Sequence, residues 1–248
     1  MDKEILPIFV FIFAGFLIGG VWFFITGRKK DEDERKKRTA KYWSYAGIVT
    51  GATLFSALGG IYWILFCLSV SFGAILEIAK AATRFSGFFR TTILVIGFIV
   101  FVLFCGSGFL FSNRSLVFTY ICVAVFDAFS QLAGQSLGRT RMAPQISPNK
   151  TWEGFAGGAF FAALFGLFFF AVIAKNPLES LPLTFGISVL SLSGDLSASW
   201  LKRKAKIKDY SNFLPGHGGI LDRFDSLIFT FACLVLLRIF DLIAFALA

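Results

Sequence analysis

The chain has 248 residues, of which 56% are hydrophobic, and it carries a formal net charge of +9. Several uninterrupted apolar runs of about 20 residues are each long enough to cross a ~30 Å hydrocarbon core as a helix, which excludes a soluble protein. These runs are continuous rather than alternating, so they predict helices and not a closed barrel. The basic residues lie in short stretches between the runs, which indicates membrane orientation and anionic lipid or phosphate ligands rather than nucleic acid.

Cutting the chain at charges and turn residues predicts an all-α, polytopic integral membrane protein with about eight transmembrane helices. The first run follows charged residues and has no clear small-x-small cleavage site, so we interpret it as a retained anchor rather than a secretory signal. The second and third runs are divided only at Gly59 and Gly60, where a re-entrant pair is the alternative. The predicted spans are 5–26, 43–58, 60–79, 91–112, 116–136, 154–174, 181–200 and 224–246.

The basic residues predict the orientation of these spans. If residues 28–41 face the cytoplasm, the stretches 80–90, 137–153 and 202–223 face it too. All lysines and arginines lie in these four stretches except Lys3, Arg114, Lys175 and Arg238. This asymmetry follows the positive-inside rule and places both termini outside. The mixed-charge stretch 27–42 is interpreted as a solvated connector.

Charged residues inside apolar spans are costly and therefore informative. Glu77 lies one helical turn before Lys80, and Arg238 lies three residues before Asp241, so we interpret both as structural pairs. The four cysteines stand alone in apolar runs, which predicts packing rather than a zinc or redox site. Small residues one turn apart predict close helix approach at Gly15/Gly19, Gly47/Gly51, Gly134/Gly138 and Gly154/Gly158.

Asp127 and Asp195 differ from these acids because neither has a basic residue within four positions. Asp127 lies in VFDAFSQLAGQSLGR, where serine and glutamines extend a polar helix face, and Asp195 lies in SLSGDLSASWLKR. An isolated carboxylate inside a span needs a metal, a cation, water or a proton. We therefore predict a polar cavity that opens to the cytoplasm, and a neutral, hydrogen-bonded acid is the alternative.

The first polar loop, GRTRMAPQISPNKTWEG at residues 138–154, places Lys150 and Thr151 directly before an apolar span. It is not a P-loop, because the glycines required before Lys-Thr are missing and no strand precedes it. Its prolines stiffen a short loop. Lys150, close to a helix N-terminus, is expected to bind phosphate.

The second polar loop, SASWLKRKAKIKDYSNFLPGHGGILDRFD at residues 197–225, combines many cations with aspartates, a glycine turn and the only histidine. The glycines permit close backbone approach to a ligand, and the cations suit a polyphosphate. Asp195 and Asp222, assisted by Asp225, offer the hard oxygen ligands that magnesium takes. We predict a phosphate and metal site here, and the alternative is a positive-inside loop that ends in a glycine turn.

These same residues resemble the signature of the phosphatidate cytidylyltransferases, also called CDP-diacylglycerol synthases. The matching pattern is SWLKR, four further residues, and then KDYSNFLPGHGGILDRFD, from Ser199 to Asp225. Two more segments agree in order, because APQISPNKTWEG is similar to the family's K-x-SP-K-KTWEG segment and SGDLSAS is similar to its GDLxES segment. The resemblance covers residues 120–230, and the N-terminal half matches in its pattern of spans.

The resemblance implies an enzyme that joins CTP to phosphatidate with magnesium, forming CDP-diacylglycerol and pyrophosphate. A lipid phosphate is already ionised near pH 7, so catalysis would consist mainly of alignment and charge neutralisation. The predicted metal ligands are Asp195 and Asp222. The predicted catalytic residues are Asp195, Asp222, Lys202, Arg203 and Lys208. The predicted substrate contacts are Asp127, Ser147, Lys150, Thr151, Ser199, Asp209, His217, Gly218, Gly219, Arg223 and Asp225.

The chain departs from the family pattern at two places. Ala198 stands where the family usually has Glu in GDLxES, and Asp127-Ala-Phe-Ser-Gln stands where an Asp-Thr-Gly-Ala-Tyr-like sequence is usual. An enzyme acting on another lipid phosphate is therefore one alternative. A lipid or ion transporter is another, although transporters often contain internal repeats and none is found here.

We divide the chain into an N-terminal transmembrane region, 1–115, and a C-terminal transmembrane catalytic region, 116–248. The expected partners are CTP, phosphatidate and the lipid bilayer, together with a second copy of the chain in a homodimer, and no nucleic acid. The expected location is the bacterial inner (plasma) membrane, with the active site facing the cytoplasm.

Overall fold

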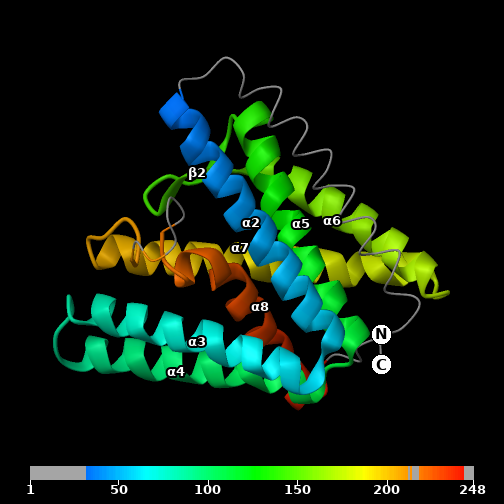
Figure 1. Ribbon diagram of the computed structural model, residues 1–248, viewed down its shortest axis with the longest axis horizontal. Helices are drawn as coiled ribbons and strands as arrows, with labels where there is room; N and C mark the ends of the chain where they lie inside the picture. Colours follow the sequence, from blue (N-terminus) through cyan, green and yellow to red (C-terminus); the bar gives the residue numbers. More distant parts are fainter. Residues whose placement is uncertain (1–31, 212, 214–217, 243–248) are drawn as a thin grey trace.

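The computed structural model describes residues 32–211, 213 and 218–242. The described chain is a bundle of helices with one short antiparallel hairpin (Figure 1). The predicted span 5–26 and His217 lie outside the described residues. The elements are α2 (Glu32–Leu58), α3 (Gly60–Ala82), α4 (Gly87–Leu110), α5 (Asn113–Leu137), β1 (Arg141–Ala143), β2 (Ser147–Thr151), α6 (Trp152–Val172), η1 (Pro177–Glu179), α7 (Ser180–Lys204) and α8 (Leu221–Ile239).

The all-α, multi-pass class is confirmed. Among the described residues, 5 stretches are long and apolar enough to cross a membrane, namely α3, α4, α5, α6 and the stretch Pro177–Lys204 that contains α7. Helix α2 contributes a shorter apolar segment, Ala46–Leu58. Helix α8 is 19 residues long and carries charged residues in its first and last turns. The predicted number of about eight spans is not confirmed by the described residues.

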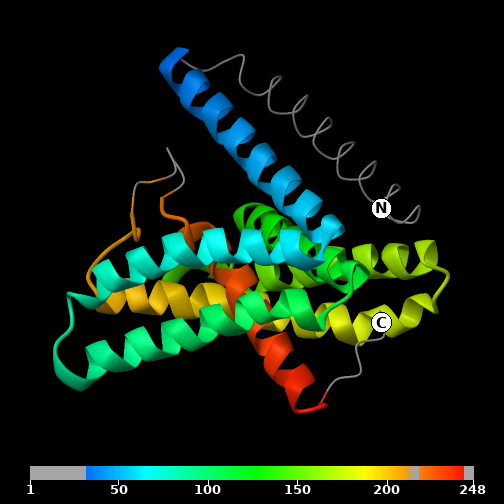
Figure 2. The same cartoon turned by 60° about the horizontal axis from the view of Figure 1, so that its bottom comes forward.

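The division at Gly59 and Gly60 separates two helices. Helix α2 ends at Leu58 and α3 begins at Gly60, and both glycines have positive φ angles, 60° and 47°. This backbone conformation costs glycine little and other residues much, so the chain turns here. Figure 2 shows that α2 then leans away from the other helices towards its N-terminal end. The predicted connector 27–42 is helical from Glu32 onwards, because α2 begins there.

Glycines let α5 and α6 pack closely. A Cβ atom added to Gly154 would lie 2.8 Å from the carbonyl oxygen of Ser130, and one added to Gly158 would lie 2.8 Å from that of Phe126. The predicted close approach at these two positions is therefore confirmed. At Gly47 and Gly51 an added Cβ would meet no heavy atom of the described residues within 4 Å, so the close approach predicted there stays a prediction.

An aromatic core holds α8 against α3 and α4. Trp63 is fully buried, and its Nε1 atom donates a hydrogen bond of 2.8 Å to Ser107 Oγ on α4. The Trp63 ring lies 5.1 Å from the ring of Phe231 on α8 and 6.2 Å from that of Phe104, centroid to centroid. Aromatic pairs at such spacings stabilise a core beyond the area they bury. This contact fixes the helix that carries Asp222 in its first turn and Asp225 directly after that turn.

Neither predicted structural ion pair forms among the described residues. Helix α8 ends at Ile239, and Asp241 lies beyond it with a φ of 52°, so Arg238 and Asp241 do not share a helix face. Glu77 contacts the start of α8 instead of Lys80. The four cysteines are free and are buried or half-buried, as the packing interpretation predicted.

Candidate active site

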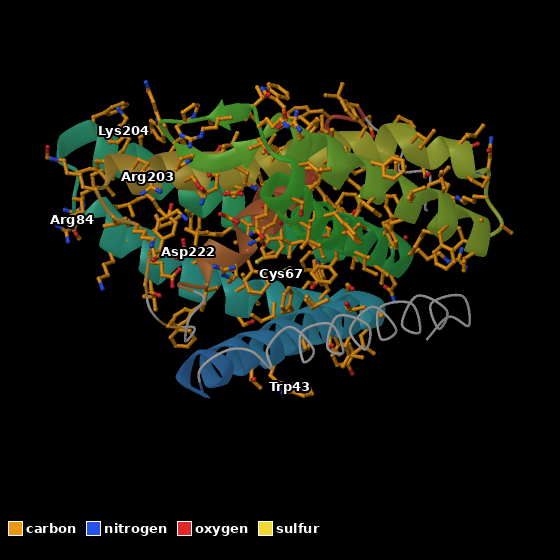
Figure 3. All side chains as sticks on the ribbon, turned by 90° about the horizontal axis from the view of Figure 1, so that it is seen from above. Trp43, Cys67, Arg84, Arg203, Lys204 and Asp222 are labelled. Carbon is orange, nitrogen blue, oxygen red and sulfur yellow. The ribbon has the colours of Figure 1, made fainter. Side chains whose placement is uncertain are left out.

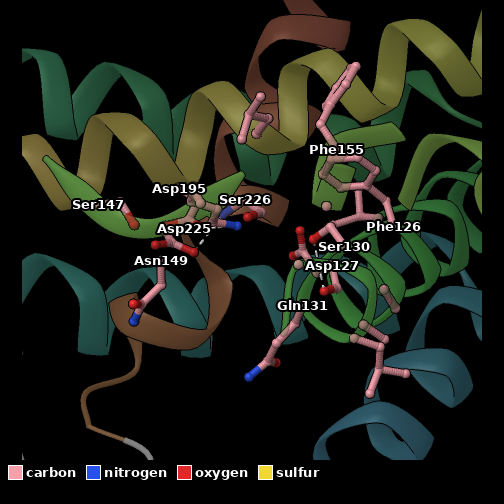
Figure 4. Close-up of a pocket in the computed structure, with 18 of the residues that line it drawn as sticks. Phe126, Asp127, Ser130, Gln131, Ser147, Asn149, Phe155, Asp195, Asp225 and Ser226 are labelled. Atoms are coloured by element: carbon pink, nitrogen blue, oxygen red, sulfur yellow. Dashed lines mark hydrogen bonds and ion pairs between the residues drawn. The ribbon is translucent and has the colours of Figure 1, made fainter. Parts of the chain in front are cut away.

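A cavity of about 1180 Å³ lies among α5, the hairpin, α7 and the start of α8. Asp127 enters its wall from α5, Lys150 from β2, Asp195 from α7 and Asp225 from α8. Figure 4 shows Asp195 and Asp225 together on one side of the cavity and Asp127 on the other. Asp222 of α8 also lines the cavity, so segments that lie far apart in the sequence bring four carboxylates to a single cavity.

Asp195 is paired with a cation from the hairpin. Its Oδ2 atom lies 2.5 Å from Lys150 Nζ, and its Oδ1 atom accepts a hydrogen bond of 3.2 Å from Ser199 Oγ. Burial by itself lowers the pKa of the Lys150 ammonium, but neighbouring carboxylates, that of Asp195 first, raise it above its ordinary value. Lys150 is therefore charged at neutral pH. It supplies a cation, which is one of the partners predicted for this isolated carboxylate beside a metal, water or a proton.

Asp127 is tied to α7 through a hydroxyl group. Ser191 Oγ donates a hydrogen bond of 2.9 Å to Asp127 Oδ1, and Ser191 is fully buried. The polar face of α5 continues along the cavity through Ser130 and Gln131 (Figure 4). The sequence singled out this face, but it did not identify Ser191 as the partner of the acid.

Asp222 is engaged by protein groups on both of its oxygens. Oδ1 accepts a hydrogen bond of 2.7 Å from Lys202 Nζ, and Oδ2 accepts one of 2.9 Å from each of the backbone amides of Tyr210 and Gly219. Gly218 has a φ of 80°, and an added Cβ there would lie 3.0 Å from Asp222 Oδ2. Asp222 thus joins α7, the segment after α7 and the start of α8.

Tyr210 closes the segment after α7 onto that helix. Its hydroxyl group donates a hydrogen bond of 3.1 Å to the carbonyl oxygen of Ala198, and the Lys202 ammonium lies 5.5 Å from the centre of its ring. Burial, together with nearby carboxylates, raises the pKa of the Tyr210 phenol. The phenol is therefore neutral at physiological pH. Tyr210 packs over α7 at Ala198, where the family usually has a glutamate.

The loop predicted to be stiffened by prolines is a hairpin of β1 and β2. Thr151 ends β2 and caps α6, because its Oγ1 atom accepts a hydrogen bond of 3.1 Å from the Gly154 amide. The predicted position of Lys150 beside a helix N-terminus is confirmed, since α6 begins at Trp152. Arg203 Nε donates to the Ile146 carbonyl oxygen at 3.2 Å, which joins the hairpin to the end of α7.

The structure brings together most of the predicted site residues. Those that line the cavity are Asp127, Ser147, Lys150, Thr151, Asp195, Lys202, Asp222, Arg223 and Asp225. Ser199 contacts Asp195, and Gly218 and Gly219 pack against Asp222. Arg203, Lys208 and Asp209 are exposed and do not line the cavity. In Figure 3, Arg203 and Lys204 lie at the same end of the molecule as Arg84.

Sequence reasoning assigned the wrong partner to Glu77. This residue is 7% exposed, and it accepts hydrogen bonds from the hydroxyl group of Ser211 and from the backbone amides of Ile220 and Leu221. It is an acid within an apolar run, and Lys80 lies at the end of that run. Its place within an apolar run was the signal that could have found it, because the nearby Lys80 meant that Glu77 did not meet the criterion of isolation from basic residues.

The carboxylates of the cavity suit magnesium in kind. Among the described residues, no group of three or more His, Cys, Asp or Glu side chains is placed to hold a metal ion by itself. Magnesium is commonly bound by one or two carboxylates together with substrate phosphates, so it does not need such a group. Asp195, with Asp127 and Asp225 on the same cavity, fits that requirement. Asp222 would first have to exchange its Lys202 partner.

The fold and cavity define a multi-pass membrane protein whose charged cavity is built from carboxylates and lysines. Comparison with known families assigns it more narrowly. The model of the cytidylyltransferase family matches residues 5–240, so the chain belongs to the cytidylyltransferase family. The family resemblance predicted from the loop signature is confirmed.

Several relatives carry one name. The chain is 46% identical over 115 residues to the phosphatidate cytidylyltransferase of Bacillus subtilis (strain 168), a match that covers 44% of this chain and 42% of that protein. It is 40% identical over 127 residues to the phosphatidate cytidylyltransferase of Brucella abortus (strain 2308), covering 51% and 47%. It is 37% identical over 147 residues to that of Staphylococcus aureus (strain COL), covering 56% of each. The chain thus spans about half the length of the curated relatives it matches.

Proposed function

We propose that this chain transfers the cytidylyl group of CTP to phosphatidate, giving CDP-diacylglycerol and pyrophosphate. The observation that carries the proposal is the family match over residues 5–240, and the relatives named above bear the name of this activity. The cavity adds a chemical reason, because cations and hard oxygen donors meet there beside apolar helices.

The reaction joins two anions. An oxygen of the phosphatidate phosphate attacks the α-phosphorus of CTP and forms a new P–O bond. The bond from the α-phosphorus to the oxygen that bridges to the β-phosphate breaks, and pyrophosphate leaves with that electron pair. The barrier is largely electrostatic, so charges fixed in advance around the reacting phosphates are the main aid a protein can give. Lys150 and Lys202 place two such charges on the cavity wall.

We propose magnesium as the cofactor. Asp195 would hold it, with Asp127 and Asp225 close by, and Asp222 stays a predicted second ligand. When bound, the ion would neutralise phosphate charge and align the two substrates. Lys150 then has two tasks, because it pairs with Asp195 and can turn to a phosphate of the substrate.

The cavity is lined by both polar and apolar side chains, which suits one water-soluble and one lipid substrate. The polar lining residues include Gln131, Gln135 and Asn149, and the apolar ones include Val49 of α2 and Val123 of α5. We propose that CTP arrives from the cytoplasm and that the lipid enters sideways from the inner leaflet of a bacterial inner membrane. A homodimer stays a prediction.

The test is to incubate purified protein with radiolabelled CTP, magnesium and one lipid phosphate at a time. We expect label in the lipid phase with phosphatidate, and much less with the matched variant Asp195→Asn. If label enters the lipid phase only with a different lipid phosphate, such as a polyprenyl phosphate, that lipid phosphate is the acceptor instead of phosphatidate. Ala198 favours that second candidate, since it removes a carboxylate usual in the family. Folded protein that labels no lipid at all would overturn the proposal.

A further inference from the structure

Glu77 is a buried carboxylate that has no part in the site described above. It lies on α3, whereas the cavity is lined by α2, α5, the hairpin, α6, α7 and α8. Its Oε1 atom accepts hydrogen bonds from Ser211 Oγ at 2.5 Å and from the Ile220 amide at 2.9 Å. Its Oε2 atom accepts one of 2.8 Å from the Leu221 amide. One side chain of α3 therefore holds the start of α8 and the segment before it.

These amides are the ones that most need a partner. The first N–H groups of a helix have no carbonyl acceptor within the helix, and α8 begins at Leu221. Leaving a buried amide unpaired is costly, and a carboxylate at a helix N-terminus also interacts favourably with the helix dipole. A helix cap usually comes from the helix's own first residues. Here Ile220 has no capping side chain, and the acceptor comes from a residue 144 positions before Leu221.

Gly219 has no side chain and therefore leaves room for the Glu77 carboxylate. A Cβ atom at residue 219 would overlap the Glu77 carboxylate. The Gly219 amide meanwhile donates to Asp222 Oδ2 at 2.9 Å. Consecutive amides before and within the first turn of α8 are thus divided between two carboxylates, Asp222 from α8 itself and Glu77 from α3. The site depends on the start of α8, because Asp222 lies in its first turn and Asp225 follows directly after that turn.

We infer that Glu77 is a positioning residue, which fixes the first turn of α8 so that Asp225 and the Asp222–Lys202 pair face the cavity. Helix α3 is itself held against α8 by aromatic packing. The ring centroids of Phe66 and Phe224 are 5.8 Å apart, and those of Trp63 and Phe231 are 5.1 Å apart. The inference rests on the proposed function, because it assigns Glu77 a role in that reaction. A small displacement of reacting groups can reduce a rate by about 100-fold, so loss of this anchor is expected to reduce turnover.

The first test is Glu77→Gln, which keeps the shape of the side chain but replaces one acceptor oxygen with an NH₂ donor. We expect kcat to fall at least ~10-fold while KM for CTP changes less than ~3-fold, because Glu77 orients the site without touching substrate. The amount of folded protein is determined by size-exclusion chromatography in detergent. Rates are divided by this amount, so that a loss of folded protein does not lower the measured kcat. The matched control is Glu179→Gln, an exposed acid on η1, which is expected to keep wild-type kcat.

The second test needs no catalysis. Hydrogen exchange followed by mass spectrometry is compared for peptides that cover Ile220 to Phe224. We expect faster exchange there in Glu77→Gln and unchanged exchange in Glu179→Gln. Ser211→Ala removes one hydrogen bond to Glu77 and leaves both α8 amides bonded, so it is the milder variant if Glu77→Gln does not fold. It is expected to lower kcat about 2- to 5-fold, in line with one hydrogen bond.

The two measurements separate the inference from the proposed function. Wild-type protein that labels no lipid overturns the proposed function, and the exchange data then decide alone whether Glu77 holds the start of α8. If wild-type protein is active, kcat within 2-fold of wild type in folded Glu77→Gln overturns the positioning role. Unchanged exchange at Ile220 to Phe224 in that variant overturns the anchor itself.

Discussion

Two aspartate–lysine pairs lie on the wall of the same cavity and differ in what surrounds them. Asp195 and Lys150 are 2.5 Å apart, with 24% and 25% of their side chains exposed. Asp222 and Lys202 are 2.7 Å apart, with only 3% and 12% exposed. The chemistry of the two pairs is the same, so the difference in exposure separates a pair that a ligand can reach from one that is built into the protein.

Hydrogen bonds widen this difference. Besides its lysine, Asp195 receives one hydroxyl hydrogen bond, from Ser199. Asp222 receives two backbone amides, from Tyr210 and Gly219. Breaking a buried pair leaves an uncompensated charge, whereas a partly exposed pair can exchange its partner for water or a ligand at little cost. The comparison predicts separate tasks for the two aspartates: Asp195 is open to a ligand, whereas the contacts of Asp222 hold the loop and would have to be exchanged before it could bind a metal.

The largest effect is expected from Asp222→Asn. Because the change leaves Lys202 buried without its counter-charge, we expect the free energy of unfolding to fall by about 3–5 kcal/mol. Thermal unfolding in detergent measures this loss of stability. The control is Asp241→Asn, which changes an exposed residue and is expected to keep wild-type stability. If Asp222→Asn melts like the wild type but has lost activity, Asp222 acts on substrate or metal and the comparison fails.

Asp195→Asn is expected to show the opposite pattern. We expect cytidylyl transfer to fall by at least ~100-fold, the scale for removing a major electrostatic group from an active site. Stability should change by less than about 1 kcal/mol, since partly exposed ion pairs contribute little. Initial rates and melting curves on the same preparation measure both quantities. Near-normal turnover in this variant would show that Asp195 is not a catalytic residue.

Gly194→Ala tests the close packing of α7 on α8, the two helices that carry Asp195, Lys202 and Asp222. An added Cβ would lie 2.7 Å from Phe229 Cβ and 3.0 Å from the Asp225 carbonyl oxygen, so we expect a loss of about 1–3 kcal/mol of stability from overpacking. At Gly186 on the same helix an added Cβ meets no atom of the described residues within 4 Å, so Gly186→Ala is expected to stabilise the protein by about 0.5–1 kcal/mol. Equal melting temperatures for the two variants would contradict the packing described here.

The smallest effect is expected from Ser199→Ala. It removes the hydroxyl hydrogen bond to Asp195 and leaves Lys150 in place. One hydrogen bond of this kind contributes about 0.5–1.5 kcal/mol, so we expect the transfer rate to fall about 3- to 10-fold. Ser197→Ala is the matched control, because Ser197 is exposed and its hydroxyl group donates a hydrogen bond to the Ser193 carbonyl oxygen of its own helix. A loss as large as that of Asp195→Asn would point to direct contact between Ser199 and substrate.

Much of the fold could be predicted because each apolar run indicates a membrane-spanning helix from its own residues, without knowledge of the other segments. The break at Gly59 and Gly60 was predicted correctly, since positive φ angles are a local property of glycine. The start of α2 at Glu32 was not, because charged, helix-forming residues are compatible both with a solvated connector and with the extension of a helix. The hairpin at residues 141–151 was also missed, since its pairing is set by contacts with α5 and α7 as well as by local turn residues.

Within the candidate site, the sequence by itself determined which residues carry unusual chemistry, because a charge within an apolar span is costly wherever it occurs. It could not determine their partners. Lys150 pairs with Asp195 from 45 positions away in the chain, and Glu77 bonds to Leu221 from 144 positions away. Such pairings depend on how the helices pack, so only the tertiary structure decided which carboxylate faces the cavity and which ones hold the protein together.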